Sequence, residues 1–160
     1  MLRFDLVRRD RISDGGGGVC FYIKSSINFS VRNDLNIADL ENLCIEVRKP
    51  QSKSLIVVSW YRPPNSPVRL YSHLENLIGK LDLTNFDFFL LGDMNINMAT
   101  TKSVNDAREL NNIAAIYGQL INEPTRITDK SSSLIDLIYT NSPERVVCSG
   151  VAHVGISDHI

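Results

Sequence analysis

The chain has 160 residues, of which 43% are hydrophobic and 22% are charged. This composition predicts one globular domain with its own core and excludes a disordered or collagen-like chain. The 17 Lys and Arg residues are balanced by 18 Asp and Glu residues, so no overall basic field attracts a polyanion and any nucleic-acid contact must be local.

The cysteines and the apolar runs indicate the compartment. Cys20, Cys44 and Cys148 are widely spaced and odd in number, which favours small apolar thiols over a disulfide framework or a zinc site. No apolar run is long enough to cross a bilayer, and no signal-peptide core follows Met1. The sequence therefore predicts a soluble intracellular protein, in the nucleus or cytoplasm, without a membrane partner.

Strand patterns fill the first part of the chain. Apolar residues alternate with charged ones over residues 2–6, as in a half-buried edge strand. Residues 8–18 predict a turn because they end in four glycines, and residues 19–24 then form the returning strand of a hairpin. Residues 43–47 alternate and residues 55–61 are rich in β-branched and aromatic side chains, so these two strands are predicted to pair.

A helix and a buried strand follow. Ser66 and Pro67 form a helix-start signal, and apolar residues recur at helical spacing over residues 70–81. Residues 86–91 form a nearly continuous apolar run, which is typical of a strand buried on both faces, and this strand is predicted to end at Gly92.

The last part of the chain combines a second helix with two further strands. The helix is predicted to start at Ser103, with Asp106 completing a capping box, and to stop at Gly118. Residues 134–140 and 145–151 have the composition of strands. Strands interrupted by two helices predict an α/β or α+β fold in which helices cover a sheet.

The first candidate site follows the buried strand. Asp93 and Asn95 are two residues apart, so in an extended segment their side chains point to the same side and can share a metal ion or a water molecule. The alternative is that these residues only form the turn that leaves the strand. Taken alone, this motif favours the turn.

Two further candidates contain carboxylates. Asp158 and His159 combine a candidate metal ligand with a group that titrates near neutral pH. Taken alone, the tripeptide Ser157–His159 favours a helix N-cap or a turn with an exposed histidine. Asp136 stands inside an apolar strand, where a buried charge needs a partner such as a histidine. The alternative for Asp136 is a place on the solvent-exposed face of its strand.

Arginine and tyrosine residues at strand ends are candidates for phosphate binding. Tyr61 and Arg62 close one predicted strand, and Arg126 lies in the loop after the second helix. Arginine has the fork-shaped donor that suits phosphate oxygens, although surface ion pairs are the commoner role. His73 and His153 have no metal-ligand neighbour in the sequence, which favours structural roles.

The order of the motifs is more specific than any single motif. In chain order the motifs are GGGGVCFYIK at 15–24, YRPPN at 61–65, GDMN at 92–95, PTR at 124–126, SSLIDLIYTN at 132–141 and SDH at 157–159. Together they resemble the endonuclease/exonuclease/phosphatase superfamily, and within it most closely the apurinic-endonuclease-like domain of animal non-LTR retrotransposons. The resemblance covers essentially the whole chain and implies a four-layer α/β sandwich, two packed mixed sheets flanked by helices, that cleaves phosphodiester bonds with Mg²⁺ or Mn²⁺.

The resemblance also implies catalytic roles for individual residues. Asp93 would orient and deprotonate the attacking water, and Asn95 would help to hold the metal ion or the phosphate. His159 would hydrogen-bond the scissile phosphate, with Asp136 orienting its ring. These roles agree with the partner that Asp136 requires and with the shared task expected of Asp93 and Asn95.

Further residues are expected at the metal ion and the phosphate. The resemblance implies that Asp158, together with Asp93, contacts the metal and that Tyr61 touches the phosphate. Arg62 and Arg126 are the candidate arginine donors to the substrate phosphate.

The chain also departs from the family pattern. The family domain begins with a strand carrying an active-site Asn and a strand ending in its principal metal ligand, a Glu, and both precede the glycine-rich hairpin. Glu41 and Glu46 follow that hairpin and do not match this glutamate. The family also continues beyond the SDH motif. We therefore expect a single domain over residues 1–160 that lacks its first two strands and its last strand and is incomplete at both ends.

These observations lead to three functional hypotheses. The first is an endonuclease that nicks target DNA and is joined to a reverse-transcriptase domain in a full-length element. The second is an inactive remnant of such a domain, because loss of a carboxylate ligand weakens Mg²⁺ binding. The third is a phosphatase or phosphodiesterase of the same superfamily with a substrate other than DNA, against which the PTR and SSLIDLIYTN motifs argue.

Overall fold

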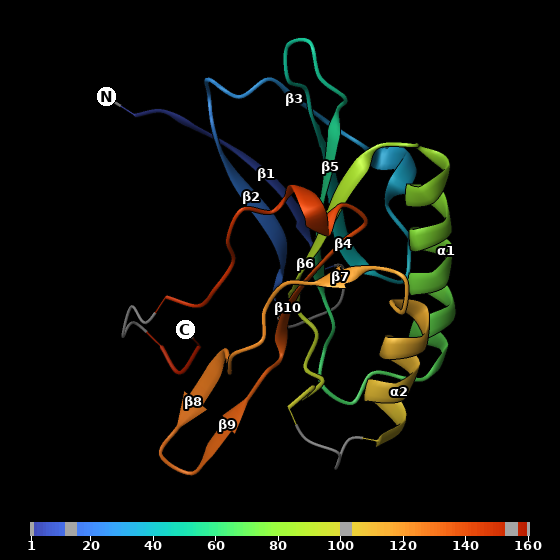
Figure 1. The fold of residues 1–160 in the computed structure, drawn as a ribbon, viewed down its shortest axis with the longest axis vertical. Helices are drawn as coiled ribbons and strands as arrows, with labels where there is room; N and C mark the ends of the chain where they lie inside the picture. Colours follow the sequence, from blue (N-terminus) through green and yellow to red (C-terminus); the bar gives the residue numbers. More distant parts are fainter. Residues whose placement is uncertain (1, 12–15, 100–103, 153–156, 160) are drawn as a thin grey trace.

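The computed structural model describes residues 2–11, 16–99, 104–152 and 157–159. Figure 1 shows their arrangement. The strands are β1 (Phe4–Asp10), β2 (Gly18–Lys24), β3 (Phe29–Val31), β4 (Glu41–Val47), β5 (Leu55–Tyr61), β6 (Asp87–Asp93), β7 (Gly118–Gln119), β8 (Arg126–Thr128), β9 (Ser131–Ser133) and β10 (Asp136–Thr140). The helices are α1 (Arg69–Leu83) and α2 (Val104–Ile113), with short 3₁₀ turns at Asn33–Leu35 and Pro143–Arg145.

A mixed sheet forms the centre of the fold. Its strand order is β3-β4-β5-β6-β10-β7, with β5 and β6 parallel and the other neighbours antiparallel. Helix α1 makes the crossover from β5 to β6, as a parallel pair requires. Strands β1 and β2 form a separate antiparallel sheet, and β8 and β9 form a small hairpin.

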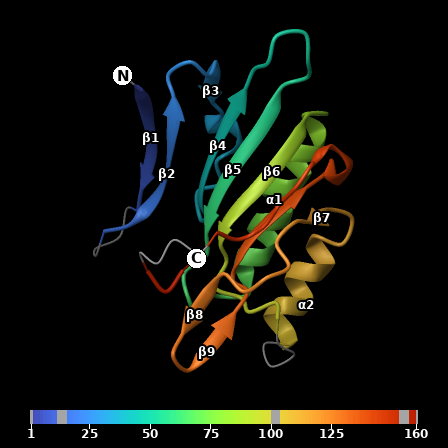
Figure 2. The same cartoon turned by 60° about the vertical axis from the view of Figure 1, so that its left-hand side comes forward.

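The helices cover one face of the central sheet (Figure 2). Alternate residues of β5, namely Ile56, Val58 and Trp60, are buried in one cluster with Leu74 and Leu77 of α1. Burial of each such side chain contributes about 1.5–3 kcal/mol relative to exposure. This helix-side core fixes which residues of each strand must point to the opposite face.

The β1–β2 sheet covers part of that opposite face. Strand β2 contacts β4 and β5, and its Val19 and Ile23 are buried. Beyond this cover, Phe89 and Leu91 of β6 are only half-buried. The expectation that residues 86–91 are buried on both faces is therefore wrong, because among the described residues a full layer covers only the helix side.

The sequence predictions for the main elements are confirmed. The β1–β2 hairpin is antiparallel, and β4 pairs with β5 across the expected turn. The α/β class, with packed mixed sheets and flanking helices, is also confirmed; the described residues form three of the four expected layers. In this part of the chain, neither helix has the length and apolar character that crossing a membrane requires.

Several element boundaries differ from the predictions. Strand β1 continues through Asp10 instead of turning at residue 8, and its predicted buried face is exposed, with Phe4 at 50%. Helix α1 begins after Ser66, whose hydroxyl donates to the Pro63 carbonyl at 2.6 Å instead of capping the helix. A local hydrogen bond within the preceding turn thus competes with the capping role predicted for Ser66.

The C-terminal predictions need more correction. Helix α2 ends at Ile113, and the predicted stop Gly118 lies in β7. Among the described residues, 145–151 contain no strand, because the chain there turns through Pro143–Arg145 and continues irregularly. Ser103 and His153 lie outside the described residues.

Candidate active site

Two aspartates face each other at one end of the central sheet. Asp93 ends β6 and Asp136 begins β10, and these two residues are direct partners in the antiparallel ladder. Directly opposed residues place their side chains on the same face. That face is the one opposite the helices, since Phe88 and Leu90 of β6 are buried in the helix-side core. The fold therefore brings both carboxylates together outside that core.

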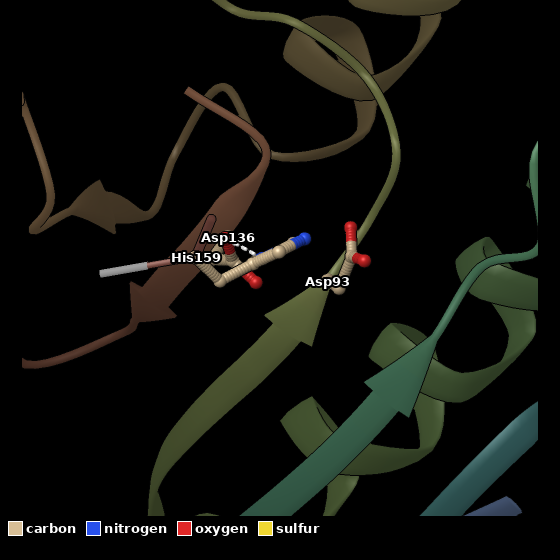
Figure 3. Close-up of side chains that lie close together, drawn as sticks. All are labelled: Asp93, Asp136 and His159. Carbon is tan, nitrogen blue, oxygen red and sulfur yellow. Dashed lines mark hydrogen bonds and ion pairs between the residues drawn. The ribbon is translucent and has the colours of Figure 1, made fainter. Parts of the chain in front are cut away.

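His159 completes the cluster. Its Nδ1 lies 3.0 Å from Oδ2 of Asp136, so the predicted histidine partner of Asp136 is present. Figure 3 shows the other ring nitrogen pointing toward Asp93. One ligand atom from each of the three residues lies within 4.8 Å of the others. The three groups are thus close enough to act on one ion or one phosphate.

The β8–β9 hairpin holds the segment that carries His159. Arg126 and His159 form an antiparallel bridge, and the Ile127 amide donates to the Asp158 carbonyl at 2.7 Å. The Arg126 guanidinium also binds the Asp158 carboxylate at 2.8 Å and keeps its pKa below the usual range. Asp158 is therefore engaged by Arg126 and lies outside the three-residue cluster, which does not support its predicted place as a metal ligand.

Asp93 has an electrostatic environment suited to proton transfer. Burial raises the pKa of its carboxyl group, and the neighbouring charge of Asp136 raises it further. The Asn95 backbone amide donates to Oδ1 at 2.9 Å and opposes this shift, as do the charges of His159 and Arg126. The net result is a pKa above the ordinary value, so this carboxylate is more basic than an exposed aspartate.

The segment after β6 turns sharply instead of staying extended. Asn95 has a φ of +49°, and its side-chain amide donates to the Arg62 carbonyl at 2.9 Å. The prediction that Asp93 and Asn95 share a ligand from an extended segment is therefore wrong. The Asn95 amide nitrogen holds the turn, so any contact with a metal ion or phosphate falls to its Oδ1.

Arg62 is not placed to bind substrate. Its side chain is 2% exposed, and its guanidinium contacts the Asp106 carboxylate at 3.2 Å and lies over the Tyr71 ring at 5.7 Å. The predicted phosphate contact is wrong because the guanidinium points into the interior between α1 and α2. Arg126, at 44% exposure beside His159, remains available to a substrate.

Tyr61 lies in the same row as the aspartates. The Arg62 amide donates to the Asp93 carbonyl at 3.0 Å, which extends the parallel β5–β6 pairing to the ends of both strands. Tyr61 is also the ladder partner of Glu41, and the Arg11 guanidinium binds Glu41 at 2.8 Å and lies 5.6 Å from the Tyr61 ring. This places Tyr61 on the site face, with Glu41 bound to an arginine.

Sequence reasoning missed a residue that fixes Asp136. The buried Thr125 hydroxyl accepts hydrogen bonds from the Ile135 and Asp136 amides, at 3.2 Å and 2.9 Å. This contact sets the start of β10 and so the position of the Asp136 side chain. The PTR motif contained this threonine, but no pattern in the sequence links a loop threonine to a strand that begins eleven residues later.

Known proteins provide an independent comparison. A family model for the endonuclease/exonuclease/phosphatase family matches residues 4–159. No curated protein matches the chain. A family protein from Leptotrichia buccalis is similar in fold, with a TM-score of 0.59 and 13% identity over 98% of this chain and 68% of that one.

Two other solved structures have similar folds. A family protein from Bacteroides thetaiotaomicron has a TM-score of 0.53 and 13% identity over 86% of this chain and 59% of that one. ANGEL2, described as a 2′,3′-cyclic phosphatase, has a TM-score of 0.59 and 11% identity over 86% of this chain and 62% of its own. This chain thus spans 59% to 68% of the three structures. Since the family model covers nearly all of its residues, the chain belongs to the endonuclease/exonuclease/phosphatase family.

Proposed function

We propose that the chain is a metal-dependent phosphodiester hydrolase that nicks DNA, similar to the endonuclease domain of non-LTR retrotransposons. One observation carries the proposal: Asp93, Asp136 and His159 are brought within 4.8 Å of one another from three separate segments. Such a cluster combines a general base, ligands for a cation and a hydrogen-bond donor to the phosphate. The order of the sequence motifs supports DNA as the substrate.

The cluster fits a hard divalent ion. The carboxylates of Asp93 and Asp136 provide the oxygen ligands that Mg²⁺ and Mn²⁺ prefer, and water molecules complete such a shell. Asp136 uses one oxygen for His159, which leaves the other for the ion. A bound ion would supply positive charge to the phosphate oxygens. Arg126 is the nearby exposed cation that we assign to the substrate phosphate.

The protein groups divide the remaining work. Asp93, with its raised pKa, accepts the proton of the attacking water as the water oxygen bonds to phosphorus. The P–O bond to the leaving sugar oxygen breaks, and that oxygen takes a proton from solvent. Asp136 holds Nδ1 of His159, so the ring presents Nε2 to the site and, when protonated, donates to a non-bridging phosphate oxygen. Because Nε2 cannot bind an ion and donate a proton at once, we assign the ion to the two carboxylates.

Plasmid nicking tests this proposal. Purified protein is incubated with supercoiled DNA in Mg²⁺, in Mn²⁺ and in EDTA, together with Asp93→Ala and the control Asp5→Ala, which removes an exposed carboxylate of β1. We expect nicking by the wild type and the control that disappears in EDTA and in Asp93→Ala. Equal nicking by Asp93→Ala contradicts the assigned mechanism.

A second arm separates the alternatives. The same proteins are given an RNA with a 2′,3′-cyclic phosphate end, because ANGEL2, which is similar in fold, is described as a phosphatase of such ends. Hydrolysis of this RNA without DNA nicking assigns the phosphatase class. A folded protein that is inactive on both substrates identifies a catalytic remnant.

A further inference from the structure

A buried arginine joins the candidate site to both helices. The Arg62 guanidinium donates to Oδ2 of Asp106 in α2 at 3.2 Å and lies over the ring of Tyr71 in α1. The Tyr71 hydroxyl donates to the other Asp106 oxygen at 2.9 Å. The single carboxylate of Asp106 therefore ties the end of β5 to α1 and α2.

The main chain of the same arginine holds the turn formed by residues 93–95. Its amide donates to the Asp93 carbonyl at 3.0 Å, and its carbonyl accepts the Asn95 side-chain amide at 2.9 Å. Asn95 in turn donates its backbone amide to the Asp93 carboxylate. A shift of the Arg62 backbone would therefore move both the Asp93 carboxylate and the Asn95 side chain.

This arrangement is costly for stability. The Arg62 side chain is 2% exposed, whereas its counterion Asp106 is 43% exposed, so the pair is desolvated mainly on the arginine side. Among the described residues, Nε of Arg62 makes no hydrogen bond. An apolar side chain at such a position often costs less, because burial of a charge must be repaid by very good geometry. Buried polar groups that lower the stability of a protein are expected where a functional site requires them.

We propose that the Arg62–Asp106 pair is a positioning device for the Asp93–Asn95 turn. By fixing the end of β5 against the two helices, it keeps the Asp93 carboxylate in register with Asp136 across the β6–β10 ladder. Arg62 is a positioning residue and does not contact substrate. The role in catalysis rests on the proposed hydrolase function, whereas the effect on the turn does not.

The test compares the Arg62–Asp106 pair with the less buried ion pairs of another arginine, Arg32. Arg62→Met removes the charge and keeps much of the length, and it leaves Asp106 partly solvated. The matched control is Arg32→Met, which removes the ion pairs with Asp34 and Glu46. Arg32 follows the edge strand β3, which β4 and β5 separate from β6 and Asp93. Tyr71→Phe is a second, milder variant that deletes only the hydroxyl bound to Asp106. All are compared at temperatures where each is folded.

Two measurements separate positioning from general destabilisation. Amide hydrogen exchange reports the turn without any activity: we expect Asn95 to exchange at least about tenfold faster in Arg62→Met than in Arg32→Met at equal global stability. Steady-state kinetics then report the site: kcat should fall about 10–100-fold with KM nearly unchanged, since a displaced carboxylate affects the transition state more than binding.

The outcomes are distinct. Faster exchange of the Asn95 amide in Arg62→Met, with a smaller increase in Tyr71→Phe, supports the positioning role of the Arg62–Asp106 pair. This result holds even if the wild type nicks no DNA, and only the proposed hydrolase function then fails. Equal Asn95 exchange in Arg62→Met and Arg32→Met overturns the proposal. So does a kcat that falls no more in Arg62→Met than in Arg32→Met when the wild type is active. If Arg62→Met does not fold, Tyr71→Phe decides by the same two readouts.

Discussion

Asp93 and Asp136 are direct partners in the β6–β10 ladder, so two carboxylates stand on one face at the same end of the sheet. Burial raises the pKa of Asp93, and the neighbouring charge of Asp136 raises it further. The pair therefore weakens the folded state at neutral pH unless a cation or a donor neutralises it. Such a cost is expected if the proposed function is correct, because catalytic sites commonly trade stability for activity.

Replacement of Asp93 by a residue that cannot ionise should increase the stability of the folded protein at neutral pH. Because the folded-state pKa of Asp93 lies above its unfolded value, its contribution to stability is greatest at acid pH and is lost as pH rises through that window. Asp93→Asn keeps an oxygen for the Asn95 amide but cannot ionise. We expect its melting temperature to exceed that of the wild type at neutral pH, while nicking is lost.

Calorimetry from pH 3 to 8 checks the sign of the effect. The difference in melting temperature between Asp93→Asn and wild type should grow as pH rises from the ordinary aspartate pKa. A difference that is constant with pH, or that shrinks as pH rises, contradicts the raised pKa. Asp5→Asn, an exposed carboxylate of β1, is the control and should show no such trend.

Asp136 and His159 should behave as one functional unit. Asp136 holds Nδ1 at 3.0 Å, and without it the ring is free to rotate away from Asp93. We expect Asp136→Ala and His159→Ala each to lower kcat about 10–100-fold, and the double variant to lose less than the product of the two losses, since only the oxygen that Asp136 offers to the ion acts independently of His159. Steady-state nicking of the four proteins forms the cycle. Losses that multiply in the double variant would show that the two residues act separately.

Local sequence patterns correctly predicted those strands and helices whose own residues carry the hydrophobic periodicity. The alternation in residues 43–47 and the apolar run of residues 55–61 are strands because their own side chains must be buried on one or both faces. Asp136 was recognised as a charge that needs a partner, and His159 provides it. A charge within an apolar run is informative even in one sequence, because burial of an unpaired charge costs a large free energy.

The predictions that failed depended on distant residues. Arg62 follows a strand and has the sequence pattern of an exposed arginine, yet Asp106, 44 residues away, draws it into the interior. The sequence likewise did not show that Arg126, 32 residues away from Asp158, binds its carboxylate, and the place of Asp158 at a metal ion stays a prediction. Residues 145–151 have strand composition, but composition does not reveal whether a neighbouring strand is available for pairing.

The exposed ion pair between Arg126 and Asp158 leads to a prediction that distinguishes two roles for Asp158. If this aspartate anchors the His159 segment through Arg126, Asp158→Asn should lower kcat and leave Mn²⁺ affinity unchanged. Arg126→Ala should then lower kcat at least as much, because it also removes the cation assigned to the substrate phosphate, and should likewise leave Mn²⁺ affinity unchanged. If it is a metal ligand, only Asp158→Asn should weaken Mn²⁺ binding, by about 10–100-fold. Titration calorimetry with Mn²⁺ measures the affinity. Lys130→Ala, on the same hairpin, is the control for loss of positive charge.

Gly92 in β6 should not tolerate the methyl group that substitution by alanine adds. Its φ is +147°, a conformation that L side chains rarely adopt, and an added Cβ would lie 1.9 Å from the Trp60 carbonyl oxygen in β5. The strand cannot yield without separating the parallel β5–β6 pair directly before Asp93. We expect Gly92→Ala to lower the free energy of unfolding by about 2–3 kcal/mol. Chemical denaturation measures this loss.

The same substitution in a helix provides the control. Gly79 lies on the exposed side of α1, where an added Cβ meets no atom within 4 Å, so Gly79→Ala should stabilise the protein by about 0.5–1 kcal/mol. The two alanines should therefore have effects of opposite sign. If Gly92→Ala were as well tolerated as Gly79→Ala, β5 and β6 would not be in such close contact, and Asp93 would not be held at the end of β6 by the Arg62 amide. A loss of nicking in folded Gly92→Ala, with KM unchanged, would instead show that this close approach sets the position of the catalytic carboxylate.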